Sequence, residues 1–303
     1  MKIPRAPREK KMPYQLLLNG IIAGSIYALI ALGFAIIYRT VKFLHLAHGI
    51  VYTTGAYLAY TFFILLHIHP IISFFLSIIL CALLGIAIDK SVYYPLRVKK
   101  ASNLIFLLAS FGVFIFLQNL IQLVYGAQIL TLRTGPVKEG YHIFSAVITP
   151  IQIWILVVSC WLLVILWGFV KYTRLGKAMR AVSDDQVAAS VVGINPDKTI
   201  LSSFAIGSAL AGAAGILISL ETNIEPTMGF SAVLKGVIAS IIGGIGSIPG
   251  AMLGGFFLGI AENLGIWKIQ AGWKDCISFI ILIIFLLLRP GGIFGVKTEK
   301  EQI

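Results

Sequence analysis

Long runs of apolar residues dominate the chain and alternate with shorter polar connections. A helix needs about 20 mostly apolar residues to cross the hydrocarbon core of a bilayer. Because unpaired backbone groups are costly in lipid, runs of this length predict helices. The runs lie at 16–38, 43–66, 70–89, 102–124, 151–170, 199–220, 231–247, 249–266 and 273–289. The pattern therefore predicts an all-α fold, a polytopic membrane protein with about 8–10 transmembrane or re-entrant helices.

The longer connections differ in charge, and this difference predicts the topology. Basic residues concentrate in 90–100 and in 171–198, whereas 125–150 is rich in glycine and proline and carries few charges. Cytoplasmic loops of membrane proteins retain Lys and Arg. We therefore expect 90–100 and 171–198 in the cytoplasm, 125–150 outside, and the tail 296–303 inside.

The basic stretch 1–13 does not agree simply with this topology. The same rule predicts that it is cytoplasmic or juxtamembrane. If 16–38 and 43–66 both cross the membrane fully, however, the N-terminus lies outside. Either the N-terminus does lie outside, or one of the two segments is broken or re-entrant. The second is the candidate for a break, because it contains His45, His48 and Gly49.

Composition excludes a soluble protein. Hydrophobic residues make up 58% of the 303 residues and charged residues only 12%, and the mean hydropathy is +0.95. A soluble domain carries about 25% charged residues. The 24 Lys and Arg exceed the 12 Asp and Glu, for a net charge of +12. These basic residues lie between apolar runs and form no stripe with interleaved aromatics, so we predict a lipid bilayer and no nucleic acid as a partner.

Cysteine and histidine do not predict a redox or metal site. Cys81, Cys160 and Cys276 each lie inside an apolar run, without the spacing of a disulfide framework or a CxxC motif. His67 and His69 flank a proline, with no thiolate or carboxylate beside them to complete a metal site. We predict no metal ligands and no catalytic residues, hence a protein that is not an enzyme.

The connection 171–198 has the pattern of a helical element. Ser183 followed by Gln186 is typical of a capping box, and an acidic pair, Asp184 and Asp185, lies in the same first turn. Gly193 stands where such a helix would end. The next sequence, Asn195-Pro196-Asp197, is typical of a new helix start. We predict a short helix over 183–193 with a small, apolar face, although an ordinary charged loop is the alternative.

Here the sequence resembles a known family. Residues 187–193, Val-Ala-Ala-Ser-Val-Val-Gly, resemble the EAA-x3-G loop of ABC importer permeases, the helix that docks into the ATPase subunit. Val187 stands where that motif has glutamate, and the following Ile-x-Leu-Pro is absent. Such divergent loops are a feature of the branched-chain amino-acid importers. Stretches 19–29, 46–49, 176–181, 243–251 and 289–295 are similar to further motifs of that group.

The resemblance covers 14–295, which we take as the permease domain, and is closest to the shorter of the two permease types. It implies a multi-pass protein of a prokaryotic cell membrane. The expected partners are a second homologous permease, two cytoplasmic ATP-binding subunits and an external solute-binding protein. The chain contains no G-x-x-x-x-G-K-[ST] phosphate loop, so ATP and Mg²⁺ are expected on the partner ATPases and no cofactor on this chain.

The implied substrate is leucine, isoleucine or valine, although similar permeases move urea and short amides. The alternatives from another class are a secondary transporter driven by an ion gradient, or a passive channel for a small polar solute.

The candidate site residues fall into three groups. The glycine-rich stretch 243–250 interrupts a helix, and irregular backbone at membrane depth is buried in protein or lines a cavity; a cytoplasmic turn fits this stretch equally well. Candidates for ATPase coupling are Arg174, Lys177, Arg180, Asp184, Asp185, Ala188, Ala189 and Gly193. Candidates for the translocation path or a helix break are Asn19, Tyr27, His48, Gly49, Gly243, Gly244, Gly246 and Pro249. Glu221 and Glu225, at the outer end of 199–220, are candidates for contact with the binding protein.

Three further ionisable residues lie in or beside the apolar runs. We expect Lys235 to extend toward the membrane interface, and Glu262 and Asp89 to be interfacial.

Overall fold

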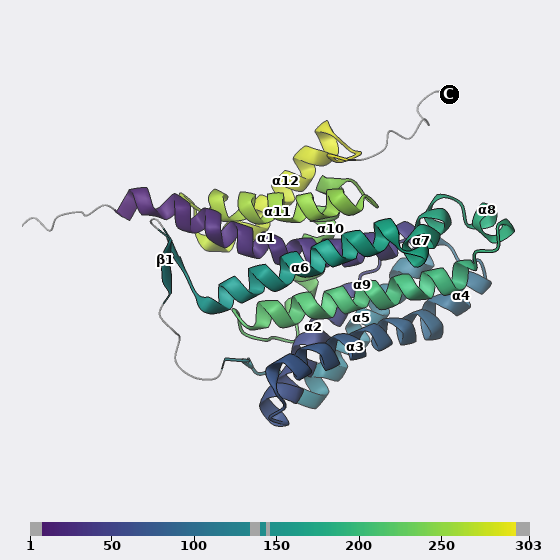
Figure 1. Ribbon diagram of the computed structural model, residues 1–303, viewed down its shortest axis with the longest axis horizontal. Helices are drawn as coiled ribbons and strands as arrows, with labels where there is room; N and C mark the ends of the chain where they lie inside the picture. Colours follow the sequence, from purple (N-terminus) through teal and green to yellow (C-terminus); the bar gives the residue numbers. More distant parts are fainter. Residues whose placement is uncertain (1–7, 134–139, 144–145, 295–303) are drawn as a thin grey trace, which may run out of the picture.

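The computed structural model describes residues 8–133, 140–143 and 146–294. Most of the basic stretch 1–13 and all of the tail 296–303 therefore lie outside the described residues or have no described side chains. Across the described part, helices account for nearly all regular structure (Figure 1). The predicted all-α membrane fold is confirmed, and a short β-hairpin in the 125–150 connection is the one addition among the described residues.

The elements run in this order: α1 Arg8–Val41, α2 His48–Tyr60, the π-helix η1 Thr61–Leu65, α3 Pro70–Ile88, the π-helix η2 Asp89–Tyr93, α4 Tyr94–Val98, α5 Asn103–Tyr125, β1 Tyr141–Ile143, β2 Ala146–Ile148, α6 Pro150–Tyr172, α7 Arg174–Asp184, α8 Gln186–Val191, α9 Pro196–Ser219, α10 Met228–Gly243, α11 Ile248–Gly265, the 3₁₀-helix η3 Ala271–Trp273 and α12 Lys274–Leu288. Strands β1 and β2 pair antiparallel, with Tyr141 opposite Ile148.

Not every predicted run is a full membrane crossing. Among the described residues, six helices are long and apolar enough to span a bilayer. They are Pro13–Val41, Pro70–Val98, Asn103–Tyr125, Pro150–Tyr172, Pro196–Ser219 and Ala271–Leu288. Helix α10, with 16 residues, is shorter than these spans, and it forms with α11 one pair bent by 117°, where two separate spans had been predicted. Helix α2 is also too short, so the chain combines full spans with shorter helices.

Helix α2 begins inside the bundle. After α1 ends at Val41, the chain turns back, and the Nε2 atom of His48 lies 3.3 Å from the carbonyl oxygen of Ile30. Ile30 lies about 16 Å from the end of α1 at ~1.5 Å per residue. The structure thus places a break within 43–66, at the His45–Gly49 stretch. The Ser110 hydroxyl accepts a hydrogen bond from the Ala47 N–H at 3.0 Å, which satisfies one of the backbone donors buried at this start.

Helix α1 is the core of the bundle. Its apolar window is 83% buried, more than any other of the six spans, and it packs on α11, α9 and α10. Glycines make the closest of these contacts possible. A Cβ atom at Gly255 would lie 2.4 Å from the Cα of Ala28, and one at Gly259 would lie 2.4 Å from the Cα of Gly24. Small residues spaced by four thus bring the backbones of α1 and α11 together, as membrane helices require.

The two ends of α1 mark the two ends of the molecule. At one end, which we call the hairpin end, the side chain of Gln15 donates to the Val147 carbonyl at 3.0 Å and accepts from the Val147 N–H at 2.7 Å. At the other, the loop end, the Nε atom of Arg39 donates to the Ser183 hydroxyl at 2.7 Å. The start of α1 and the 171–198 connection therefore lie at opposite ends (Figure 1).

The contact between α1 and α11 predicts a strong effect of one added side chain. In Gly255→Val the new side chain meets the α1 backbone, and overpacking of this kind costs about 1–3 kcal/mol or more. Gly112→Val on α5 is the matched control, because nothing lies within 4 Å of an added Cβ there. We expect Gly255→Val to lower the melting temperature of the purified protein in mild detergent, and Gly112→Val to leave it unchanged. Equal melting of the two variants would contradict the packing described here.

Candidate functional site

The 171–198 connection forms two helices rather than the single predicted one. Helix α7 ends at Asp184, and the six-residue α8 follows it. The cap of α8 is Asp185, whose carboxylate accepts hydrogen bonds from the N–H groups of Val187 at 2.7 Å and Ala188 at 3.0 Å. The predicted capping box of Ser183 and Gln186 is therefore wrong. The cap lies two residues later than predicted, at Asp185 instead of Ser183, because aspartate is as good an N-cap as serine.

The end of α8 agrees with the sequence pattern. Gly193 has a φ of +86°, in the left-handed region that favours glycine. Its N–H donates to the Ser190 carbonyl, and the next N–H, of Ile194, donates to the Ala189 carbonyl, which together form a Schellman motif. Asn195 then caps α9 by accepting from the Lys198 N–H at 3.0 Å. The exit from α8 is thus fixed by backbone geometry.

Arg39, at the end of α1, joins this connection to the bundle. In addition to its bond to Ser183, its Nη2 atom lies 3.6 Å from the Asp184 carboxylate. Beside it, the Gln186 side chain donates to the Thr40 carbonyl at 3.0 Å. The polar residues of the predicted capping box therefore tie α7 and α8 to α1. Sequence reasoning missed Arg39, because it looks like an ordinary basic residue at the end of an apolar run.

The free surface of the connection is its tip. Val187, Val191 and Val192 are 73%, 81% and 74% exposed. Ala189, in contrast, is 3% exposed and packs inward. Ala188 lies on the exposed side.

The basic candidates of the connection divide in the same way. Arg174 and Lys177 are exposed on α7. Arg180 donates to the carbonyls of Val170 and Lys171, at the end of α6. Arg180 therefore holds α7 against α6, and Arg174 and Lys177 remain available to a partner.

The glycine-rich stretch forms the bend between α10 and α11. Gly244 and Gly246 have φ values of +106° and +84°, and Ser247 caps α11, with Pro249 in its first turn. Gly243 and Gly250 lie in backbone contact across the bend, since a Cβ at Gly243 would lie 2.0 Å from the Gly250 carbonyl oxygen. These residues close a tight turn that a larger side chain would not allow.

The bend lies at the loop end, beside Arg39. A Cβ at Gly246 would be 3.7 Å from the Cγ of Arg39. The chain after α12 returns here, where the N–H groups of Ile293 and Phe294 donate to the carbonyls of Ile242 at 2.8 Å and Gly243 at 3.0 Å. The end of α10 is thereby capped. The bend, the end of α1 and the α7–α8 connection form one continuous structure.

The remaining path candidates are separated. Asn19 accepts from Gln15 at 3.0 Å near the hairpin end. His48 and Gly49 are buried at the start of α2, where Gly49 lies in backbone contact with Gly229 of α10. Tyr27 belongs to a third group, described next.

A buried charged cluster connects α1, α10, α11 and α12. The Lys235 ammonium lies 3.3 Å from the Glu262 carboxylate, 3.1 Å from Asp275 and 3.1 Å from the Tyr27 hydroxyl. Tyr27 and Ser278 both donate to Glu262, which is 0% exposed. Lys235 and Glu262 therefore face each other within the bundle, while Asp275 at its edge is 64% exposed. Each charge is held inside the bundle by the other.

Asp89, which was also expected at the interface, is 2% exposed. Arg97 holds it with two hydrogen bonds, at 2.6 and 3.1 Å. A two-point contact of this kind is the geometry in which a guanidinium best neutralises a carboxylate.

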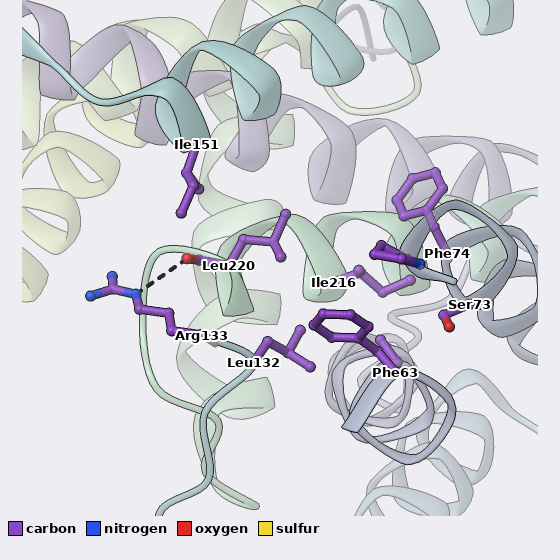
Figure 2. Close-up of a pocket in the computed structure, with 10 residues that line it drawn as sticks. Phe63, Ser73, Phe74, Leu132, Arg133, Ile151, Ile216 and Leu220 are labelled. Carbon is purple, nitrogen blue, oxygen red and sulfur yellow. Dashed lines mark hydrogen bonds between the residues drawn. The ribbon is translucent and has the colours of Figure 1, made fainter. Parts of the chain in front are cut away.

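A pocket of about 270 Å³ opens at the hairpin end. Figure 2 shows its apolar walls, with the Arg133 side chain at one side donating to the Leu220 carbonyl at 3.3 Å. It is lined by Ala59, Phe63, Pro70, Ser73, Phe74, Leu132, Arg133, Ile151, Ile216 and Leu220. Glu221 follows directly and accepts from Gln152 at 2.7 Å, while Glu225 is exposed. The sequence identified Glu221 and Glu225 as candidates, but it did not predict the pocket, whose walls come from segments far apart in the chain.

Within the described residues, no group of three or more His, Cys, Asp or Glu side chains is placed to hold a metal ion. The polar groups brought together by the fold are ion pairs and helix caps, which hold helices and connections in place.

These features define a class: a multi-pass membrane permease with a helical connection docked at one end and an open pocket at the other. Comparison with known proteins defines it further. The family model for the permease component of the branched-chain amino acid transport system matches residues 16–286. The chain belongs to this family and is a transport component of the cell membrane, part of a transporter complex.

Individual relatives agree along nearly the whole chain. The high-affinity branched-chain amino acid transport system permease protein LivH of Escherichia coli is 38% identical over 302 residues, which cover 95% of this chain and 97% of LivH. BraD of Pseudomonas aeruginosa is equally similar, with the same coverage. A probable LivH of Methanocaldococcus jannaschii is 30% identical, over 96% of both chains.

One solved structure shares the fold. PsaBC from Streptococcus pneumoniae, in complex with Fab, matches with a TM-score of 0.52 at 14% identity. The match covers 91% of this chain and 92% of that one. At this identity the likeness concerns the helical architecture.

Loss of the Arg39 side chain should loosen the α7–α8 connection. Arg39→Met removes the bonds to Ser183 and Asp184, and a hydrogen bond to a charged group contributes about 1.5–3 kcal/mol. We expect amide hydrogen exchange over 174–192 to become about 10-fold faster or more. Lys42→Gln, an exposed cation three residues away, is the control and should leave exchange unchanged. Equal protection in Arg39→Met and the native protein would show that the connection is held elsewhere.

Removing one member of the buried cluster should cost more than removing two. Lys235→Met leaves the Glu262 carboxylate buried without its cation, and breaking a buried pair in this way costs about 3–5 kcal/mol. Lys235→Met/Glu262→Gln removes the unpaired charge, so we expect it to recover much of the lost thermal stability in detergent. If the double variant melts no higher than Lys235→Met, the two charges do not stabilise each other.

Proposed function

We propose that the chain is the membrane-spanning subunit of an ATP-driven ABC importer that takes up branched-chain amino acids delivered by an external binding protein. The substrate class follows from the names of its relatives. The observation that carries the proposal is the docked connection, whose exposed valine tip is joined through Arg39 to α1 and to the bend between α10 and α11.

The distribution of basic residues supports placing the loop end of the molecule in the cytoplasm. This end holds most of the basic residues of the described chain: Arg39, Lys42, Lys90, Arg97, Lys99, Lys100, Lys171, Arg174, Lys177, Arg180 and Lys198. The hairpin end carries Glu221 and Glu225 and a smaller number of basic residues, among them Arg133 and Arg8, Lys10 and Lys11 at the start of α1. By the positive-inside rule the loop end faces the cytoplasm. The start of α1 then faces outward, and the basic stretch 1–13 is an exception to the rule.

The tip of α8 is the surface on which an ATPase subunit would act. When ATP closes the two ATPases on each other, a docked α8 moves with them as a rigid body. Along the chain, α8 is followed by α9, which begins after Asn195, and is preceded by α7, which Thr173 joins to α6. Through Arg39 the connection also contacts α1, a helix that the sequence analysis did not link to coupling, and the end of α1 lies against the bend. Motor movement would thus reach the helices that enclose the path.

The other partners follow from the same arrangement. The pocket near Arg133, with Glu221 and Glu225 beside it, lies at the end that would face the binding protein. The apolar window of α12 is only 6% buried, so its surface is available to lipid and to a second permease. ATP and Mg²⁺ would bind to the ATPase subunits, since this sequence has no phosphate loop.

Val191→Glu should uncouple the transporter. We expect a charged side chain at the tip of α8 to prevent ATPase docking, because it would have to be desolvated in an apolar contact. The measurement is co-purification of ATPase subunits from native membranes, together with leucine uptake by ATP-loaded proteoliposomes. Ile129→Glu, at an apolar residue 62% exposed toward the other end, is the control and should retain its ATPase.

Three outcomes would contradict the proposal. Leucine uptake by the purified chain alone that collapses with a protonophore would indicate a secondary transporter. Equilibration without ATP would indicate a channel. Uptake of urea or short amides, but not of leucine, would overturn the substrate class while leaving the ATP-driven mechanism intact.

A further inference from the structure

A second pocket, of about 330 Å³, lies at the loop end between the η2–α4 segment and the start of α9. Its lining residues are Asp89, Lys90, Tyr94, Arg97, Asp197, Lys198 and Leu201. None of them lies on α7 or α8, in the bend between α10 and α11, or in the pocket at the hairpin end. Figure 1 shows α4 and the start of α9 side by side at the same end as α7.

The pocket combines a cationic rim with an apolar wall. Lys90 and Lys198 are exposed on its two sides, one from each helix. Tyr94 is 44% exposed, and Leu201 lies about one turn deeper into the bundle than Lys198. A ligand that satisfies both parts must carry a negative charge at one end and an apolar portion at the other.

The polar groups of the pocket leave a donor free. Arg97 neutralises the buried Asp89 through both terminal nitrogens. Its Nε atom is buried without a hydrogen-bond partner, and the nearest carboxylate oxygen, on Asp197, is 3.8 Å away. With three cations and two carboxylates in the lining, one positive charge remains in excess. An anionic oxygen would complete this set.

The surroundings place the pocket at the level of lipid head groups. The same continuous helix, Pro70–Val98, exposes Ile79 and Leu83 below the pocket, at 55% and 53%. Such a surface faces hydrocarbon, and the basic residues begin where it ends. Basic pockets between transmembrane helices on the cytoplasmic side are suited to anionic head groups.

We propose that this pocket binds an anionic phospholipid of the cytoplasmic leaflet. The phosphate would lie between Lys90 and Lys198, and an acyl chain would lie along Tyr94 and Leu201. A lipid bound there bridges α4 and α9, and so steadies the helix that leaves the α7–α8 connection.

The experiment measures lipids bound to the full-length chain by native mass spectrometry. The chain is purified in detergent with phosphatidylcholine and titrated with phosphatidylglycerol. We expect one tightly bound phosphatidylglycerol in the native protein, and about 25-fold weaker binding in Lys90→Gln/Lys198→Gln, roughly fivefold for each lysine. Lys42→Gln/Lys171→Gln removes the same charge from the same end, outside the pocket, and should bind like the native protein.

Three results would overturn the proposal. Equal losses in the two double variants would indicate a general charge effect. Equal retention of phosphatidylcholine would show that the pocket does not select an anionic head group, and displacement of the lipid by millimolar inorganic phosphate would indicate a site for free phosphate. None of these depends on the transported substrate.

Discussion

Direct backbone contact between α1 and α11 is the constraint on which this structure depends. In lipid, apolar side chains gain little by leaving their surroundings, so helices associate through close packing. Gly24, Gly255 and Gly259 permit an approach that any larger residue would prevent. The result is a central helix that is buried along its membrane-spanning length.

Polar contacts attach α1 to neighbouring elements at its start, its middle and its end. Gln15 ties its start to the hairpin, and Arg39 ties its end to the α7–α8 connection. Between them, Tyr27 reaches the pair of Lys235 and Glu262. Each buried charge described above has a partner of opposite sign, as burial away from water requires. The pair of Lys235 and Glu262 joins helices α10 and α11, and the pair of Asp89 and Arg97 lies within the continuous helix Pro70–Val98.

The sequence predicted those features that depend on local pattern. The apolar runs corresponded to helices, and Gly193 and Asn195 lie where the end of one helix and the start of another were expected. What it could not predict are pairings between distant positions. Arg39 and Ser183 are 144 residues apart, and Tyr27 and Glu262 are 235 apart. No periodicity marks such partners, so Ser183 looked like a helix cap and nothing in the sequence linked Glu262 to Tyr27.

In the proposed mechanism, α8 transmits force from a separate ATPase. A photo-cross-linking amino acid in place of Val191, activated in intact membranes, tests it most directly, because this side chain is 81% exposed at the tip of α8. Mass spectrometry of the product should identify an ATP-binding subunit, with a yield that changes between the ATP-bound and nucleotide-free states. Cross-linking to an external binding protein, or to lipid alone in an assembly that accumulates its substrate, would contradict the claim.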